Sequence, residues 1–287
     1  MSESISRRAL VRNAAAFSIM SASTALGSQA NSAITVGLIG GGGRGMYVSC
    51  KAAVKSRKHI FLEKAAGVDA AGCRRVLAAA KAADPIRRIS MDFQQRYGKD
   101  YRKALEVVRS GELGKVKRLR TDAEQQVRAA WMGGQDCHNI DVVNWFMGKH
   151  PARVSGYGSQ MQRKKGNIYD NLSLSFQFDD GTIFSYSANQ FGNPGWNDIS
   201  ETFVCESGVV QTSRKGYQIH RPGKPVEEAF TKYDIAEDTV NQFIEGVRTG
   251  KIENAAIWGA ESTMTAVMAL QACTSGKEAT WDQVYNS

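Results

Sequence analysis

The chain has 287 residues, of which 42% are hydrophobic and 23% charged. This length and composition are typical of one or two globular domains with a sizeable core, and they exclude a largely disordered chain. The formal net charge is +9, but the lysines and arginines are spread along the chain without a nucleic-acid-binding motif, so we expect no nucleic-acid partner. The five cysteines are scattered without CxxC spacing, so we expect buried thiols rather than a metal site or disulfides.

Residues 1–33 have the features of a twin-arginine export signal. Residues 6–12 read SRRALVR, and a weakly apolar stretch follows them before small residues at Ala30 and Ala33. The stretch is too short and too poor in leucine and isoleucine to span a membrane stably. We therefore expect removal of about 30 residues, a periplasmic location and no stable membrane insertion. The alternative is a short amphipathic helix.

Residues 34–45 read ITVGLIGGGGRG, a β-branched strand followed by glycines at Gly40, Gly42 and Gly45. Glycines at this GxGxxG spacing let the backbone approach a pyrophosphate, and the helix that follows favours the negative charge at its N-terminus. The pattern predicts a dinucleotide-binding turn.

A second strand is predicted at residues 59–64, HIFLEK, which end in Glu63 and Lys64. Only 17 residues separate Gly45 from Glu63. Because one βαβ unit takes roughly 30 residues, this gap cannot hold the full set of strands and helices of a doubly wound cofactor domain. We therefore predict a shortened Rossmann-like domain over residues 34–90.

The pattern of the residues after 69 predicts helices first and then mostly strands. Apolar residues at helical spacing indicate helices over residues 70–83 and 99–114, with a strand over 86–95 between them. Segments in which apolar and polar residues alternate, separated by turns, then predict strands within 116–125, 153–162, 171–190, 201–214 and 216–221. Two helices are predicted after them, at 237–249 and 255–275. We expect an α/β domain followed by an α+β domain at 91–287 with a large, mainly antiparallel open sheet and flanking helices.

Four segments in this order resemble the Gfo/Idh/MocA oxidoreductases: GLIGGGGRG, AAVKSRKHIFLEK, SMDFQQRYGKDYRKALEVVRSGELGKV and CHNIDVVNWFMGKHPARV. The resemblance covers nearly all of the chain after residue 33. It implies a dinucleotide domain followed by a domain with a large open sheet. It also implies NAD or NADP as cofactor, a sugar or cyclic polyol as substrate, and a homo-oligomer.

The resemblance also assigns roles to five residues. Lys64 is the active-site lysine, Glu63 supports the nicotinamide end of the cofactor, and His138 is the acid/base histidine. Asp141 binds substrate hydroxyls, and Arg96 lies near the same pocket. The chemistry agrees, because a histidine or a desolvated lysine can take the proton of a secondary alcohol. The structural alternatives are a buried or capping histidine at a helix start and a solvated lysine at a strand end.

The chain departs from the family pattern at three places. The strands that carry the ribose-binding acid are missing after Gly45, Gly134 stands where the family has an acid four residues before the histidine, and Ala65 replaces a proline. Three functions therefore remain open. They are a sugar or polyol oxidoreductase impaired by loss of part of the cofactor domain, an NAD-dependent glycosidase of the same superfamily, and a non-catalytic sugar-binding or assembly descendant. The shortened domain predicts weak binding of NAD(H) and NADP(H), or none.

Overall fold

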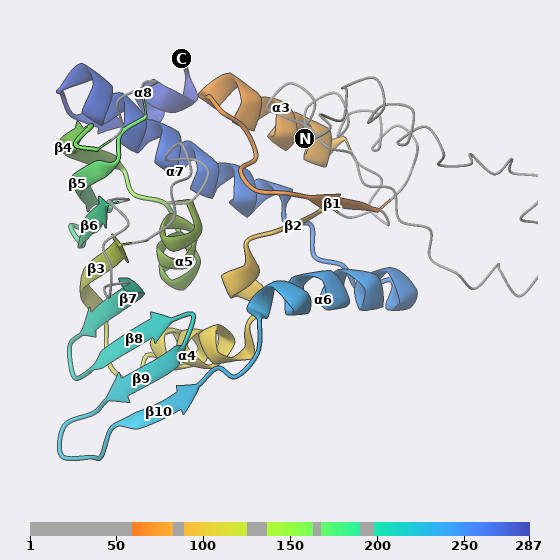
Figure 1. Ribbon diagram of the computed structural model, residues 1–287, viewed down its shortest axis with the longest axis vertical. Helices are drawn as coiled ribbons and strands as arrows, with labels where there is room; N and C mark the ends of the chain where they lie inside the picture. Colours follow the sequence, from red (N-terminus) through yellow and green to blue (C-terminus); the bar gives the residue numbers. More distant parts are fainter. Residues whose placement is uncertain (1–58, 83–88, 125–136, 163–167, 190–197) are drawn as a thin grey trace, which may run out of the picture. The chain divides into compact units, whose positions relative to one another are not determined.

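The computed structural model describes residues 59–82, 89–124, 137–162, 168–189 and 198–287 (Figure 1). The predicted export segment and the predicted glycine turn at Gly40, Gly42 and Gly45 lie outside these residues. None of the helices in the described ranges is long and apolar enough to cross a membrane.

The described chain begins with a β–α–β unit. Strand β1 (Ile60–Leu62) pairs in parallel with β2 (Ile89–Met91), and helix α3 (Ala70–Lys81) connects them. Asp69 caps α3, since its side chain accepts a hydrogen bond from the Gly72 N–H at 2.6 Å. The strand predicted over 86–95 is shorter than expected, because a 3₁₀ helix, η3 (Gln94–Tyr97), follows β2.

A nine-stranded mixed sheet dominates the rest of the described chain, in the order β10-β9-β8-β7-β3-β6-β5-β4-β11. Only β3 and β6 pair in parallel; the other neighbours are antiparallel. The strands are β3 (Val116–Glu124), β4 (Arg153–Ser159), β5 (Asn171–Gln177), β6 (Ile183–Asn189), β7 (Asp198–Cys205), β8 (Val209–Ser213), β9 (Gly216–His220), β10 (Glu227–Phe230) and β11 (Ala279–Thr280). The large, mainly antiparallel sheet predicted from the sequence is confirmed.

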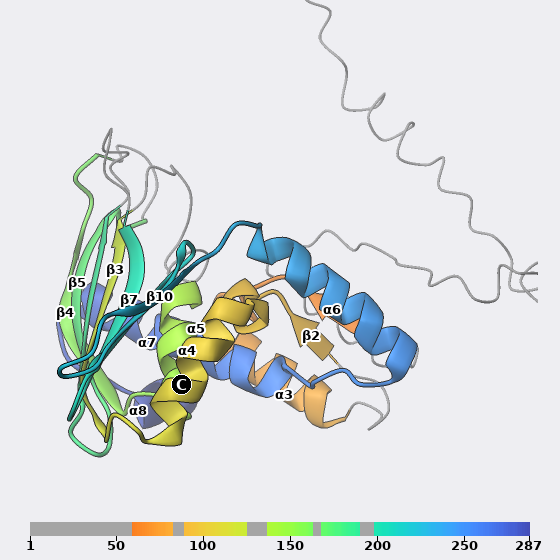
Figure 2. The same ribbon diagram turned by 90° about the horizontal axis from the view of Figure 1, so that it is seen from below.

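The helices lie on one face of this sheet (Figure 2). Helix α4 contacts β8 and β9, α5 contacts β3 and β7, and α7 contacts β4 and β11. The helices are α4 (Lys99–Ser110), α5 (Cys137–Met147), α6 (Ile235–Thr249), α7 (Ala256–Ser275) and α8 (Trp281–Tyr285). Side chains alternate accordingly: Leu172, Leu174 and Phe176 of β5 are buried against the helices, while Ser173 and Ser175 point to the other face and are exposed.

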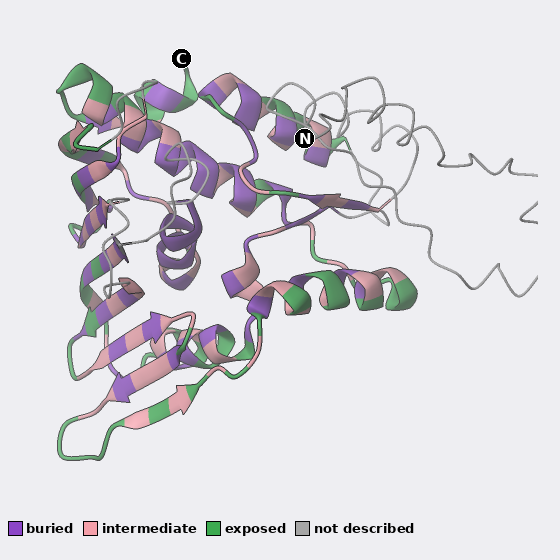
Figure 3. Ribbon diagram, in the orientation of Figure 1, coloured by how far each residue is buried: buried purple, intermediate pink, exposed green. Residues whose placement is uncertain are grey.

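Two helices form the interior of the described chain. Every residue of α5 except Trp145 and Met147 is buried (Figure 3). Helix α7 packs against α5 and β4 and also against α3 and β2, so it joins the parallel pair to the large sheet. Gly259 permits the close approach of α7 to β2, because a Cβ at this position would lie 2.2 Å from the Met91 sulfur.

Gly259→Ala should therefore destabilise the protein by about 1–3 kcal/mol, the usual cost of overpacking a core. Urea unfolding followed by circular dichroism measures this loss. Gln271→Ala, on the exposed side of the same helix, is the matched control and should change stability by less than about 0.5 kcal/mol. Equal stability of Gly259→Ala and the parent protein would mean that α7 does not pack on β2 this closely.

Candidate active site

Helix α7 anchors the segment that carries Lys64. Lys64 follows β1 and is half-buried, and the peptide bond between Lys64 and Ala65 is cis. The Ala66 N–H donates a hydrogen bond to the Thr263 hydroxyl of α7 at 3.0 Å, and that hydroxyl donates to the Gly259 carbonyl at 2.8 Å. Thr263 is fully buried. This contact fixes the path of the chain as it leaves β1, and therefore the position of the Lys64 backbone.

Two carboxyl groups stand beside each other at the ends of the parallel strands. Glu63 follows β1 and Asp92 follows β2, and the Asp92 N–H continues the ladder to the Leu62 carbonyl at 2.9 Å. The pKa of Glu63 is raised to about 7, although its side chain remains partly exposed. The causes are partial burial, a side-chain hydrogen bond to Asp92 and the charge of Asp92; the charge of Lys64 acts in the opposite direction. A carboxyl pair at the carboxyl end of parallel strands, where α/β proteins bind ligands, can thus hold one proton near neutral pH.

Asp92→Asn should lower the pKa of Glu63 from about 7 toward 4.5, because two of the causes that raise it come from Asp92. The remaining burial should keep it above 4.5. Carbon-13 NMR of the labelled glutamate side chains across pH 3–9 measures the shift directly. Glu245→Gln, on the exposed side of α6, is the control and should leave the Glu63 titration in place. An unchanged Glu63 pKa in Asp92→Asn would rule out a shared proton.

His138 lies in the first turn of α5 and is buried. Its ring meets Phe93 edge-on, with 5.9 Å between ring centroids, and its Nδ1 has no hydrogen-bond partner within the described ranges. Burial, followed by the positive charges of Lys64 and Arg214, holds the pKa of His138 well below its ordinary value. The charge of Lys64 therefore acts on His138.

Arg96 and Asp141 form a buried ion pair. The guanidinium of Arg96 donates from Nε to Asp141 Oδ2 at 2.7 Å and from Nη2 to Oδ1 at 2.9 Å. The Ser262 hydroxyl of α7 donates to the same Oδ1 at 2.6 Å. The guanidinium also stacks on Trp258, with its central carbon 3.7 Å from the ring centroid. Burial raises the pKa of Asp141, and the charge and hydrogen bonds of Arg96 act against that increase.

These contacts bear on the expected role of Asp141. The residue is fully buried, so a substrate hydroxyl could reach its carboxylate only by displacing Arg96 or Ser262. Its role in substrate binding stays a prediction. What the structure establishes is a polar contact that ties η3, α5 and α7 together. Sequence reasoning missed Ser262 and Thr263, and their only signal was a pair of adjacent hydroxyl side chains inside a mostly apolar helix.

Asp141→Asn should lower the free energy of unfolding by about 3–5 kcal/mol, because it leaves the Arg96 charge buried without its partner. Thermal and urea unfolding measure the loss. Glu278→Gln breaks the exposed Arg153–Glu278 ion pair and serves as the control, with an expected cost of about 0–1 kcal/mol. A stable Asp141→Asn variant with a raised KM would instead favour the substrate-binding role.

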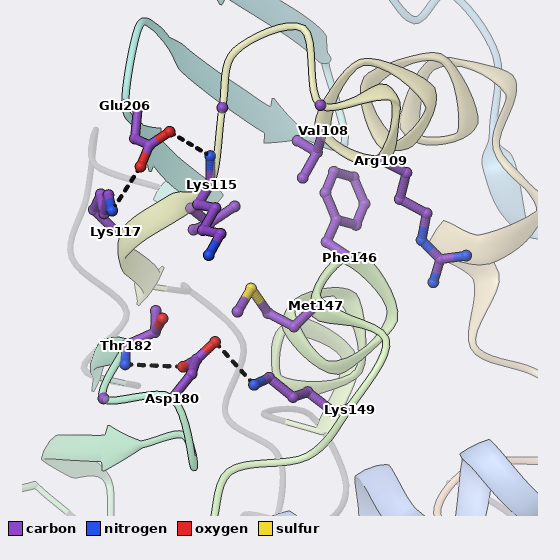
Figure 4. A pocket seen from close by; sticks show the side chains of 14 residues that line it. Val108, Arg109, Lys115, Lys117, Phe146, Met147, Lys149, Asp180, Thr182 and Glu206 are labelled. Atoms are coloured by element: carbon purple, nitrogen blue, oxygen red, sulfur yellow. Dashed lines mark hydrogen bonds and ion pairs between the residues drawn. The ribbon is translucent and has the colours of Figure 1, made fainter.

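A separate cavity of about 770 Å³ lies at the other end of α5 (Figure 4). Its floor includes Phe146 and Met147, and ion pairs line its rim, including Lys117 with Glu206 and Lys149 with Asp180. None of the predicted site residues lines it. Among the described residues, no group of three or more histidines, cysteines, aspartates or glutamates could hold a metal ion.

The sheet domain matches a known family model. Residues 101–211 match the GFO/IDH/MocA C-terminal domain, a range that runs from α4 to β8 and includes His138 and Asp141. Residues 101–211 thus belong to the Gfo/Idh/MocA family of oxidoreductases. Members of the family combine a Rossmann domain with a large sheet, and the β1–α3–β2 unit and the nine-stranded sheet are the described parts of that fold.

Relatives of the chain include proteins named as inositol dehydrogenases. It is similar to a myo-inositol 2-dehydrogenase from Thermotoga maritima, with 23% identity over 250 residues covering 79% of this chain and 73% of the relative. Its fold is similar to aldose-aldose oxidoreductase from Caulobacter crescentus complexed with glycerol, with 19% identity, coverage of 82% and 76%, and a TM-score of 0.67. It is also similar to an inositol dehydrogenase homolog from Azotobacter vinelandii complexed with NADH and myo-inositol, with 10% identity, coverage of 82% and 75%, and a TM-score of 0.70.

Proposed function

We propose that this Gfo/Idh/MocA protein is an NAD- or NADP-dependent oxidoreductase that acts on a secondary hydroxyl of a sugar or cyclic polyol. The observation that carries the proposal is that one turn of α7 holds both the segment that follows Lys64, through Ala66, and the helix that carries His138, through Asp141. The Lys64 charge also lowers the pKa of His138. The names of its relatives supply the substrate class, since they include inositol dehydrogenases and a sugar oxidoreductase.

The two side chains can divide the proton chemistry between them. With its pKa held well below the ordinary value, His138 is neutral at pH 7 and can accept the proton of the substrate hydroxyl. Nδ1 is the ring nitrogen that has no partner among the described residues. The positive charge of Lys64 stabilises the alkoxide that forms as the proton leaves. In the reverse direction the protonated histidine returns the proton to the carbonyl oxygen.

The described residues fit the nicotinamide end of the cofactor. Glu63 and Lys64 lie at the carboxyl end of the parallel strands β1 and β2, the edge at which dinucleotides bind in α/β folds. NAD or NADP, when bound there, would accept the hydride of the alcohol carbon. The residues proposed to hold its pyrophosphate, Gly40, Gly42 and Gly45, lie outside the described ranges.

Lys64→Ala and His138→Ala should each lower kcat by roughly a hundredfold or more, the scale of a lost acid/base group. The assay follows reduced nicotinamide with myo-inositol, scyllo-inositol and free aldoses, each with NAD and with NADP. His150→Ala is the control: His150 stacks on Trp281 with ring centroids 3.5 Å apart, and this variant should keep the parent kcat.

Two outcomes would contradict the proposal. Full activity in both the Lys64 and the His138 variant would mean that the reaction uses other residues. Absence of fluorescence change on titration of the protein with NADH or NADPH, together with no turnover on any substrate, would favour a non-catalytic descendant.

A further inference from the structure

A carboxyl group that the proposed mechanism does not use is buried in the middle of the large sheet. Glu201 lies on β7 and is completely buried. Its neighbours across the sheet are Thr121 on β3 and Thr212 on β8, so a polar row runs through the centre of the covered face. Burial of a carboxyl group is costly, and an apolar side chain would fill this position without that cost. Packing alone therefore does not explain a glutamate here.

Both oxygens of Glu201 accept a hydrogen bond. The Thr212 hydroxyl donates to Oε2 at 2.6 Å, and the Asn139 side-chain amide of α5 donates to Oε1 at 2.8 Å. Asn139 is itself buried. Its hydrogen bond to Glu201 ties the first turn of α5 to strand β7 of the sheet.

Asn139 directly follows His138, so this contact also bears on the histidine. The His138 ring packs against Phe93, but within the described part of the chain its Nδ1 has no hydrogen bond to orient it. The direction of the ring therefore depends on the placement of the helix backbone at residues 138 and 139. The Glu201–Asn139 hydrogen bond fixes that backbone against β7.

A second link between the two residues is electrostatic. Arg214, in the turn between β8 and β9, lowers the pKa of Glu201 and also that of His138. Burial nevertheless raises the pKa of Glu201 to about 8, against its hydrogen bonds from Thr212 and Asn139 and against the Arg214 charge. Glu201 is therefore uncharged below about pH 8 and negative above it. Its negative charge would oppose that of Arg214 and favour the protonated form of His138.

We propose that Glu201 is a positioning residue that holds the first turn of α5 through Asn139 and thereby orients His138 for proton transfer. This proposal rests on the proposed function, because it gives His138 the acid/base role. Glu201 touches neither the substrate nor the cofactor in this assignment. It acts on the reaction only through the placement and the electrostatic surroundings of the histidine.

NMR of the His138 ring tests the proposal without a substrate. In the parent protein, the carbon-13 shift of Cε1 should show an inflection near pH 8, where Glu201 loses its proton. Glu201→Gln keeps the shape of the side chain and should abolish this inflection. Glu206→Gln is the matched control, because Glu206 is a partly exposed carboxylate just after β7 that pairs with Lys117, and its loss should leave the inflection in place.

Asn139→Ala tests the positioning itself and leaves the carboxyl group intact. It should lower kcat by roughly ten- to hundredfold with KM changed by less than about twofold, because misplacement of a reacting group slows the chemical step more than binding. The double variant Glu201→Gln/Asn139→Ala should be no slower than Asn139→Ala alone, since Asn139→Ala already removes the hydrogen bond that residue 201 accepts.

The results separate this proposal from the proposed function. An inflection near pH 8 that persists in Glu201→Gln, or a parent-like kcat in Asn139→Ala, would overturn the positioning role while leaving an active oxidoreductase. Failure of the parent protein to turn over any polyol would overturn the proposed function, and the NMR experiment would still decide whether Glu201 acts on His138.

Discussion

The buried ion pair between Arg96 and Asp141 is the interaction on which the arrangement of the site depends. Each charge would be costly to bury alone, and the pair is tolerated because its geometry is bidentate and its remaining acceptor capacity is used by Ser262. The three residues come from η3, α5 and α7. These elements must therefore meet in one relative position, since a small slide of any one would leave a buried charge without its partner.

The position of α7 then determines the rest of the site. Ser262 holds α5 through Asp141, and the next residue, Thr263, holds the segment after β1 through the Ala66 N–H. One turn of a helix thus sets both the strand end that carries Lys64 and the helix that carries His138. The result is a buried histidine whose pKa is lowered first by burial and then by the charges of Lys64 and Arg214, so that it is neutral at pH 7.

The sequence predicted the regular elements well and the polar interior poorly. Helices α3, α4, α6 and α7 and the central strands follow from apolar periodicity, and Gly111, in the left-handed conformation at φ 75°, ends α4 within the predicted span. Strands β10 and β11 and helix α8 were missed, because they are short edge elements whose pairing depends on distant neighbours. The family motif drew attention to Lys64 and His138. Glu201 carried no such signal: alternation with Phe203 and Cys205 places it on the covered face of β7, but it does not reveal the partner on α5.

The contacts of α7 and α8 also have a consequence for the order of folding. Ala66 finds its partner 197 residues later in the chain, at Thr263, and Arg74 donates to the carbonyl of Tyr285, 211 residues later. During synthesis the strand end with Lys64 emerges long before the helix that fixes it. Pairings of such long range are slow to form and leave apolar surface exposed meanwhile. The β1–α3–β2 unit therefore reaches its final packing only after nearly the whole sheet domain has been made.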